Sequence, residues 1–423
     1  PAAAKYVAAE GSLSTKVTQK IVSASVTGEA FNMPAGPVGI AAGTEYREET
    51  SATSFDALTQ AGLNAGNALP NTEGKYNVKE IFVEAHVPLL KNIPMVKSLD
   101  ASAAVRQGKY STVGSVNSWT AGLEWAVTSD IRFRGTSAKS TRAPNVNELF
   151  AAPAQTFPTG IVDPCKGITT TGTSATAVNC RKDAGVLANL AANGDVFKLN
   201  QADTQGISGY DSGNPNLNAE KGKSNTLGMV FTPKSIAMLR NFAFTVDYFD
   251  IKIADAIQNP GRQFTLKECY SGDASYCRFI KRRQLPAGSN SAGSLEFVNQ
   301  TNVNSGGLNT AGVDMTAAYS NKIGPGVLNA RYSWTHLTKY DTQANPGAVI
   351  DTKLGEIGTP KNKWILGLNY DIGNLGFKTT TTFIGKSAVD DVLLHDDGGF
   401  LPGAVTVGSQ NSLDLHTNYN LGM

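Results

Sequence analysis

The stretch Ser118-Trp119-Thr120-Ala121-Gly122-Leu123-Glu124-Trp125-Ala126-Val127 places an apolar residue at every second position and a small or polar residue between. Side chains of a β-strand point to opposite faces with this period, so one face is apolar and the other is polar. The next segment repeats the pattern, with Ile131 and Phe133 on one face and Arg132 and Arg134 on the other. Roughly a dozen such segments follow one another, which is typical of a membrane-spanning β-barrel.

Aromatic residues near the ends of the apolar faces favour a membrane barrel over a soluble β-sandwich. Trp119 and Trp125 bracket one apolar face, and Trp364 and Tyr370 bracket another. Amphipathic rings collect at the two interfaces of a bilayer, whereas the core of a sandwich has no such interfaces.

Composition excludes several other classes. A net charge of +2 with no basic stripe argues against nucleic-acid binding. No run of about twenty apolar residues exists, which argues against a helical membrane protein. The histidines are scattered, and no nucleophile elbow, zinc-protease or phosphate-loop motif is present, so we expect neither an enzyme nor a cofactor. The four histidines are His86, His336, His395 and His416.

Thirteen alternating segments predict an all-β, antiparallel, up-and-down sheet. They lie at about 20–30, 38–49, 80–87, 99–106, 118–127, 131–140, 227–231, 242–248, 313–319, 328–334, 364–368, 375–383 and from 413 onward. Bacterial single-chain barrels have even strand counts and no free edge. We therefore expect residues 1–423 to form one part of a larger barrel, with an open gap between the first and last strands. Apolar residues after Asp250 break the alternation, which predicts a bulge there or an exit from the membrane.

Short connections alternate with long polar ones along the chain. The longest cover about 143–221 and 258–307, and the first is expected to be too polar to bury a core. In outer-membrane barrels the short turns are periplasmic and the long loops extracellular, which gives the orientation. The chain begins at Pro1 without a charged and apolar leader, as a mature or partial chain would.

Four cysteines form two local pairs, Cys165 with Cys180 and Cys269 with Cys277, each inside one of the long loops. Local pairs in exposed loops predict disulfides formed in an oxidising compartment such as the bacterial periplasm. Neither loop has the tight cysteine spacing and nearby histidines of a zinc site, so disulfides are favoured over metal.

Two charged clusters have simple interpretations. The triplet Lys281-Arg282-Arg283 is expected to be solvated or to contact anionic lipid headgroups, and a ligand site is the less favoured alternative. Asp390 and Asp391, followed by His395-Asp396-Asp397, could bind calcium or a ferric ligand through oxygen atoms. They lack the spacing of a calcium-binding loop, so a solvated loop is favoured.

Five motifs closely resemble segments of TonB-dependent outer-membrane receptors, in the same order. They are Gly43–Glu48, Arg142–Phe150, Asn214–Lys221, Asp247–Ile251 and Thr310–Asp314. The resemblance implies a barrel of about 22 strands in a Gram-negative outer membrane. It also implies an N-terminal plug domain, and uptake of a scarce ligand when the TonB complex pulls on the N-terminal part. By its motifs the chain is similar to the middle and later part of such a barrel, without the plug or the TonB-contacting segment.

The expected partners are therefore outer-membrane lipid, the plug domain, the TonB complex and a small or oligomeric ligand. Charged residues on polar faces are expected to pair with one another or with the plug, in preference to a ligand. They are Glu45, Arg47, Glu84, Arg132, Arg134 and Arg142. Candidate ligand contacts in the loops are Tyr210, Tyr270 and Tyr276, and the ligand could be a siderophore, cobalamin, a saccharide or a similar molecule. The alternative is a passive porin or structural barrel, but several long loops favour a receptor.

Overall fold

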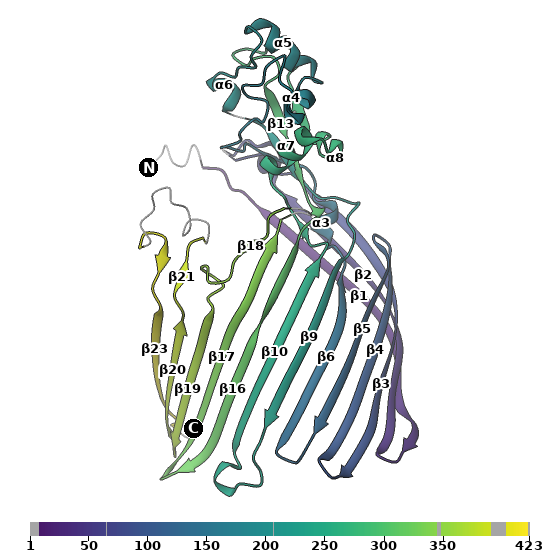
Figure 1. Cartoon of the computed structure of the whole chain (residues 1–423), viewed down its shortest axis with the longest axis vertical. Helices are drawn as coiled ribbons and strands as arrows, with labels where there is room; N and C mark the ends of the chain where they lie inside the picture. The colour runs from purple at the N-terminus through teal and green to yellow at the C-terminus, as the bar shows by residue number, and fades with distance from the viewer. Residues whose placement is uncertain (1–7, 65, 206, 345–347, 391–402, 422–423) are drawn as a thin grey trace.

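One large antiparallel sheet dominates the structure, a computed structural model that describes residues 8–64, 66–205, 207–344, 348–390 and 403–421 (Figure 1). Its continuous strand path is β1 (Leu13–Met33), β2 (Gly36–Phe55), β3 (Thr72–Ile93), β4 (Val96–Tyr110), β5 (Gly114–Ala126), β6 (Ile131–Arg142), β9 (Glu220–Phe231), β10 (Phe242–Ala254), β16 (Gly307–Ile323), β17 (Gly326–Gln343), β19 (Asn362–Ile372), β20 (Leu375–Ile384) and β23 (Gln410–Tyr419). A short strand, β18 (Asp351–Thr352), pairs with β17 and makes this a 14-stranded sheet. The thirteen predicted segments correspond one to one with the strands of the path, so the predicted fold class is confirmed.

The sheet is open within the described residues. β1 and β23 form its two edges, and every other strand of the path pairs with the strands before and after it. No helix among the described residues is long and apolar enough to cross a membrane.

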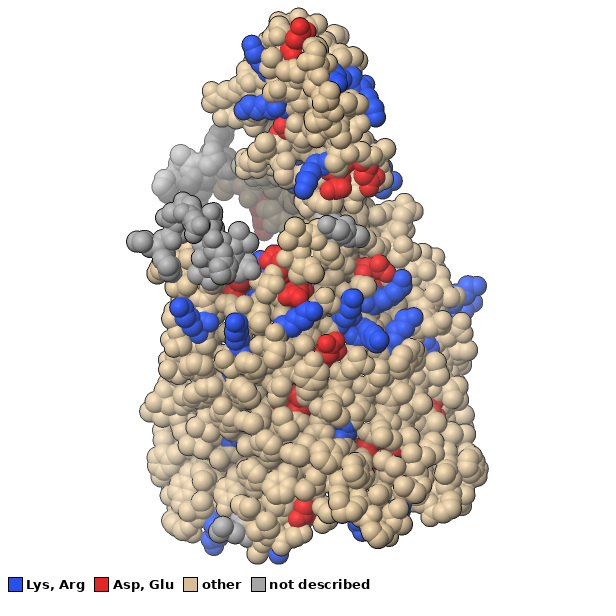
Figure 2. All heavy atoms as spheres, in the orientation of Figure 1, with Lys and Arg blue, Asp and Glu red and all other residues tan. Residues whose placement is uncertain are grey.

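Strand register keeps the apolar and polar faces separate across the sheet. Leu123 of β5 lies opposite Ala101 of β4 and Gly135 of β6. Glu124, on the other face, lies opposite Arg134. Because a one-residue slip would reverse every side chain, these registers hold the predicted apolar residues together on one face, called here the apolar wall. The opposite face is called the polar wall. Figure 2 shows few charged side chains over the middle height of the visible outer surface.

The predicted bulge near Asp250 is wrong. β10 pairs without a register shift with both β9 and β16, so the alternation continues through Asp250. Phe249 and Ile251 therefore stay on the polar wall, although they are apolar. Phe249 has room because its partner across the strands is Gly312, and a side chain added there would meet the Phe249 ring at 2.9 Å. Phe249 thus packs on the polar wall over Gly312, and the alternative prediction, an exit from the membrane near Asp250, stays a prediction.

The apolar wall gives a direct test of its expected contact with lipid. Replacing Leu123, which is 49% exposed, with arginine should destabilise a lipid-embedded barrel by about 2 to 4 kcal/mol if it lies near the midplane. The matched change Thr120→Arg, on the polar wall of the same strand, should have little effect. Urea unfolding of both variants in lipid vesicles measures the difference. Equal costs at the two positions would mean that the faces are assigned backwards.

The two longest connections fold together into one body. Figure 1 shows this body beyond the end of the sheet at which the long connections lie, called here the loop end. We call it the loop dome: residues 143–219, between β6 and β9, and residues 255–306, between β10 and β16. Its helices are α3 (Val146–Phe150), α4 (Ala175–Cys180), α5 (Ala184–Ala192), α6 (Gln201–Thr204), α7 (Arg262–Ser271) and α8 (Ala274–Cys277). Its strands are β7 (Ala154–Thr156), β8 (Gly209–Ser212), β11 (Ile257–Gln258), β12 (Ile280–Arg282), β13 (Leu295–Val298), β14 (Gln300–Thr301) and β15 (Val303–Asn304). Outside the dome lie α2 (Ala57–Ala61), a 3-10 turn at Ala237–Leu239, β21 (Ser387–Ala388) and β22 (Thr406–Val407).

The dome has a hydrophobic core of its own, which corrects the expectation that the first loop is too polar to bury one. Val186, Leu190 and Phe197 from the first connection pack with Leu266 and Leu295 from the second, and all five are buried. Neither connection supplies the core alone. β8 of the first also pairs with β14 of the second. The core was missed because its residues lie roughly eighty to a hundred positions apart and show no continuous periodicity.

Candidate ligand-binding site

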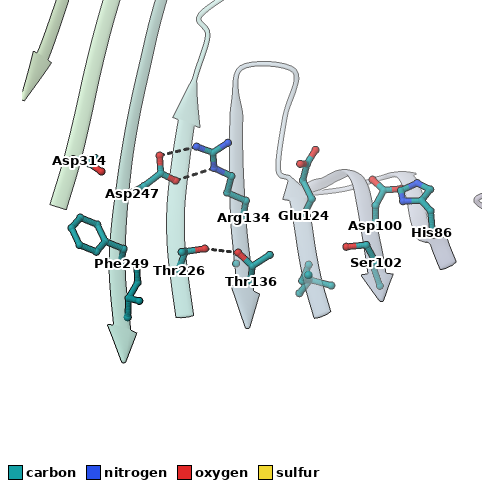
Figure 3. Close-up of a pocket in the computed structure, with 15 residues that line it drawn as sticks. His86, Asp100, Ser102, Glu124, Arg134, Thr136, Thr226, Asp247, Phe249 and Asp314 are labelled. Carbon is teal, nitrogen blue, oxygen red and sulfur yellow. Dashed lines mark hydrogen bonds and ion pairs between the residues drawn. The ribbon is translucent and has the colours of Figure 1, made fainter. Parts of the chain in front are cut away.

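A large hollow lies on the polar wall of the sheet. It has a volume of about 800 Å³ and is lined by seven neighbouring strands, from β3 to β16. Figure 3 shows charged and hydroxyl side chains from these strands lining it. The labelled acidic groups are Asp100, Glu124, Asp247 and Asp314. Carboxylates therefore outnumber the basic groups in the hollow, Arg134 and His86.

Arg134 is held in the hollow by a two-pronged ion pair. Its guanidinium donates to both carboxylate oxygens of Asp247, at 2.9 and 2.7 Å, across β9 (Figure 3). Paired bonds of this kind fix the orientation of an arginine as well as its position. Gly228 of β9 lies between the two residues, and a side chain added there would collide with Asp247. The glycine thus makes room for the bridge.

A second charged network lies on β2, β3 and β4, on the same wall. Arg47 lies 3.0 Å from Glu45 and 3.0 Å from Glu49, and Arg106 lies 2.8 Å from Glu80. The sequence predicted that opposite charges on this face could pair with each other, and the structure contains those pairs.

The other two wall candidates are less enclosed. Arg132 lies 3.0 Å from Glu124, and both side chains are nearly half exposed. Glu84 is exposed and lines a smaller hollow, of about 480 Å³, formed by strands β1 to β5.

Arg142 joins the end of the sheet to the base of the loop dome. It donates to both oxygens of Glu148 at 3.0 Å and to both oxygens of Glu220, at 2.5 and 2.8 Å. Glu148 also completes a capping box with Asn145 at the start of α3. Arg142 therefore ties together the end of β6, α3 and the start of β9.

Both predicted disulfides are present in the loop dome. Cys165 and Cys180 are joined across 15 positions, and Cys269 and Cys277 across 8. Cys165, Cys180 and Cys269 are buried in the shared core. The first disulfide belongs to one connection and the second to the other, so each closes a loop within its own connection, and the shared core joins the two.

A buried ion pair crosses between the two connections. Arg282 is 3% exposed and donates to both carboxylate oxygens of Asp163 at 2.6 Å, and to the hydroxyl of Tyr270 and the carbonyl of Gly293. Burial alone would lower the pKa of Arg282, but the Asp163 carboxylate outweighs it and raises that pKa above its ordinary value. The interpretation of the triplet as solvated is therefore wrong for Arg282, although Lys281 remains exposed beside Glu296. Sequence alone gives no sign of Asp163, which lies 119 positions away.

The family model described as "TonB dependent receptor-like, beta-barrel" matches residues 7–422. The chain belongs to this family. None of the curated protein sequences matches it detectably.

Solved structures of receptor barrels share the fold at low sequence identity. A ferric enterobactin receptor mutant from Pseudomonas aeruginosa, in complex with enterobactin, is 15% identical, with 96% of this chain and 47% of that chain covered and a TM-score of 0.59. The siderophore receptor PirA from Acinetobacter baumannii is 12% identical over 97% of this chain and 49% of that chain, with a TM-score of 0.55. The FrpB iron transporter from Neisseria meningitidis is 13% identical over 96% and 49%, with a TM-score of 0.50. The chain thus spans about half the length of the TonB-dependent receptors that it matches.

The three candidate tyrosines of this receptor barrel differ in exposure. Tyr270 is only 7% exposed, and its hydroxyl accepts a hydrogen bond from Arg282. It is therefore part of the dome core and is not proposed as a ligand contact. Tyr276 is half-buried and packs edge-on against Phe264, at 5.5 Å between ring centres. Tyr210, on β8, is 39% exposed. Of the three, Tyr210 has the most surface to offer a ligand.

The acidic cluster near His395 lies outside the described residues, apart from Asp390. No group of three or more potential metal ligands occurs among the described residues.

Proposed function

We propose that this chain is part of an outer-membrane receptor of a Gram-negative bacterium. The receptor binds a scarce ligand outside the cell and imports it with energy from the TonB complex. The single observation that carries the proposal is the loop dome, in which two distant connections share a core and a buried ion pair beyond the loop end of a barrel wall. A long binding loop must lose conformational freedom when it binds, and a folded, disulfide-closed body has lost most of it beforehand.

The polar wall is proposed to face the plug domain of the complete receptor. The interior of outer-membrane barrels is polar, and the apolar wall would then face lipid. The excess of carboxylates in the large hollow favours positively charged plug residues as its partners. The ion pairs of Arg47, Arg132 and Arg134 are proposed to hold the wall in shape for that contact.

We propose that the protein is not an enzyme and needs no resident cofactor, because Arg47, Arg132 and Arg134 of the polar wall are engaged in ion pairs that suit a structural role. The candidate ligands are siderophores, cobalamin, saccharides and similar molecules. Iron–siderophore complexes are the first ligands to test, since the structures that share the fold include siderophore receptors.

The proposal predicts saturable ligand binding at the dome. Cells that carry the complete receptor, kept cold to prevent transport, should bind one member of a panel of labelled iron–siderophore complexes saturably. Tyr210→Ala should weaken that binding about tenfold, the usual scale for an exposed aromatic contact. The matched control is Tyr419→Ala, an exposed tyrosine at the opposite end of the sheet, which should bind normally.

The passive-porin alternative predicts a different result. A porin would admit small solutes in proportion to their concentration and would show no saturable surface binding to any ligand. If cobalamin or a saccharide bound saturably and siderophores did not, the proposed receptor function would be retained and only the class of ligand would change.

A further inference from the structure

Three lysines lie side by side on the apolar wall, close to its loop end. Lys223 of β9 lies directly opposite Lys139 of β6 on one side and Lys252 of β10 on the other. Residues opposite each other in neighbouring strands have β-carbons about 4.5 to 5.5 Å apart, and like charges in such pairs repel. The row therefore places three positive charges together, although their mutual repulsion does not stabilise the sheet.

The row is not neutralised by the protein. No carboxylate oxygen of the described residues lies within 4 Å of these three ammonium groups. Asp250 lies on this face two residues further from the loops than Lys252, and no ion pair within 4 Å joins it to the row. Asp255, just beyond the loop end of β10, is paired with Lys221. Lys223 and Lys252 are exposed. The charges are free to meet an external anion.

A polar hollow of about 400 Å³ adjoins the row on the same face. Its lining includes Lys139, Lys221 and Asp255, with the polar side chains of Thr141 and of Ser115 and Asn117 of β5 beside them. Lys221 is paired with Asp255 at 2.8 Å, which leaves Lys139 as the unpaired cation in the lining. The hollow thus offers hydroxyl and amide groups next to the lysine row.

The level of the row matches that of a lipid headgroup. On the same face Leu227 and Tyr248 lie four residues closer to the short turns than Lys223 and Lys252, about 13 Å along the strand. Both are exposed and begin the apolar part of the wall. Figure 2 shows a band of Lys and Arg over the upper part of the wall, above a surface with few charges. A second lysine pair, Lys79 opposite Lys109, lies on the same face of β3 and β4.

We propose that Lys139, Lys223 and Lys252, with the adjoining hollow, bind the phosphorylated headgroup of a lipid in the membrane leaflet at the loop end. Lysine ammonium groups bind phosphate as point charges, and a run of them at a membrane surface attracts anionic headgroups. The hollow takes the polar part of the headgroup beside the phosphate. This inference rests on the proposed outer-membrane location and extends it to a specific lipid site.

The test compares the complete receptor with a Lys139→Gln, Lys223→Gln, Lys252→Gln variant. Each is purified in detergent and mixed with a bis-phosphorylated glycolipid, the same glycolipid without phosphates, or inorganic phosphate, and bound lipid is counted by native mass spectrometry. The matched control replaces Lys91, Lys97 and Lys322, three exposed lysines at the strand ends beside the short turns, with glutamine. We expect the row variant to lose at least about tenfold in retention of the phosphorylated lipid, and the control to retain it.

Three outcomes would overturn the proposal: equal retention by the row and control variants, equal retention of the lipid without phosphates, or full displacement by millimolar inorganic phosphate, which would indicate a free-anion site. Membrane fractionation and cold ligand binding are measured on the same variants. If both are normal while the lipid is not retained, the lipid site fails and the proposed function stands. If the wild-type receptor is absent from the outer membrane, the proposed function fails as well.

Discussion

Asp163→Ala should destabilise the loop dome by about 3 to 5 kcal/mol, because it leaves the charge of Arg282 buried without its partner. The remaining partners of that guanidinium are the Tyr270 hydroxyl, the Gly293 carbonyl and the Cys165 sulfur, which are neutral and cannot replace a carboxylate. The loss should be confined to the dome, since the sheet is held by its own strand pairing. Hydrogen exchange should therefore become faster in α5, α7 and β13 while exchange in β3, β4 and β5 stays slow.

Two controls make this result specific to the buried pair. Lys281→Ala removes a neighbouring but exposed ion pair with Glu296 and should cost less than about 1 kcal/mol. The double change Asp163→Ala, Arg282→Met should recover part of the stability, because it removes the unpaired charge and keeps an apolar side chain of similar length. Unchanged dome exchange in Asp163→Ala would mean that the pair does not hold the two connections together.

The sheet could be predicted from the sequence because its information is local. Period-two alternation in segments such as Ser118–Val127 needs only neighbouring residues, and all thirteen strands of the path were found in order. The exception was the region of Asp250. There the alternation looked broken because Phe249 covers Gly312 of the next strand, a contact that depends on a residue 63 positions away.

The site was only partly predictable for the same reason. Arg134 and Arg142 were identified from parity, but their partners Asp247 and Glu220 come from other strands. Both partners lie within motifs quoted in the sequence analysis. Assigning them to Arg134 and Arg142, however, required the register of the strands. The local disulfides could be predicted from spacing. The dome core and the Asp163 to Arg282 pair could not, because they join residues of two separate connections that lie far apart in the sequence.

Energised import is the central claim of this account, and uptake with and without TonB tests it most directly. The complete receptor is expressed as the sole receptor for its ligand in two strains that differ only in the presence of TonB. A labelled ligand identified by the cold-binding assay is supplied at a concentration below that needed for passive entry. In each strain, surface binding in the cold and accumulation at growth temperature are measured on the same cells.

We expect surface binding to be equal in the two strains, because the dome needs no energy to bind. Accumulation should fall to the level of cells without the receptor when TonB is absent. Tyr210→Ala should instead lower binding and accumulation together in the strain with TonB, which separates ligand recognition from energy supply. Accumulation that continued unchanged without TonB would contradict the account and favour a passive porin.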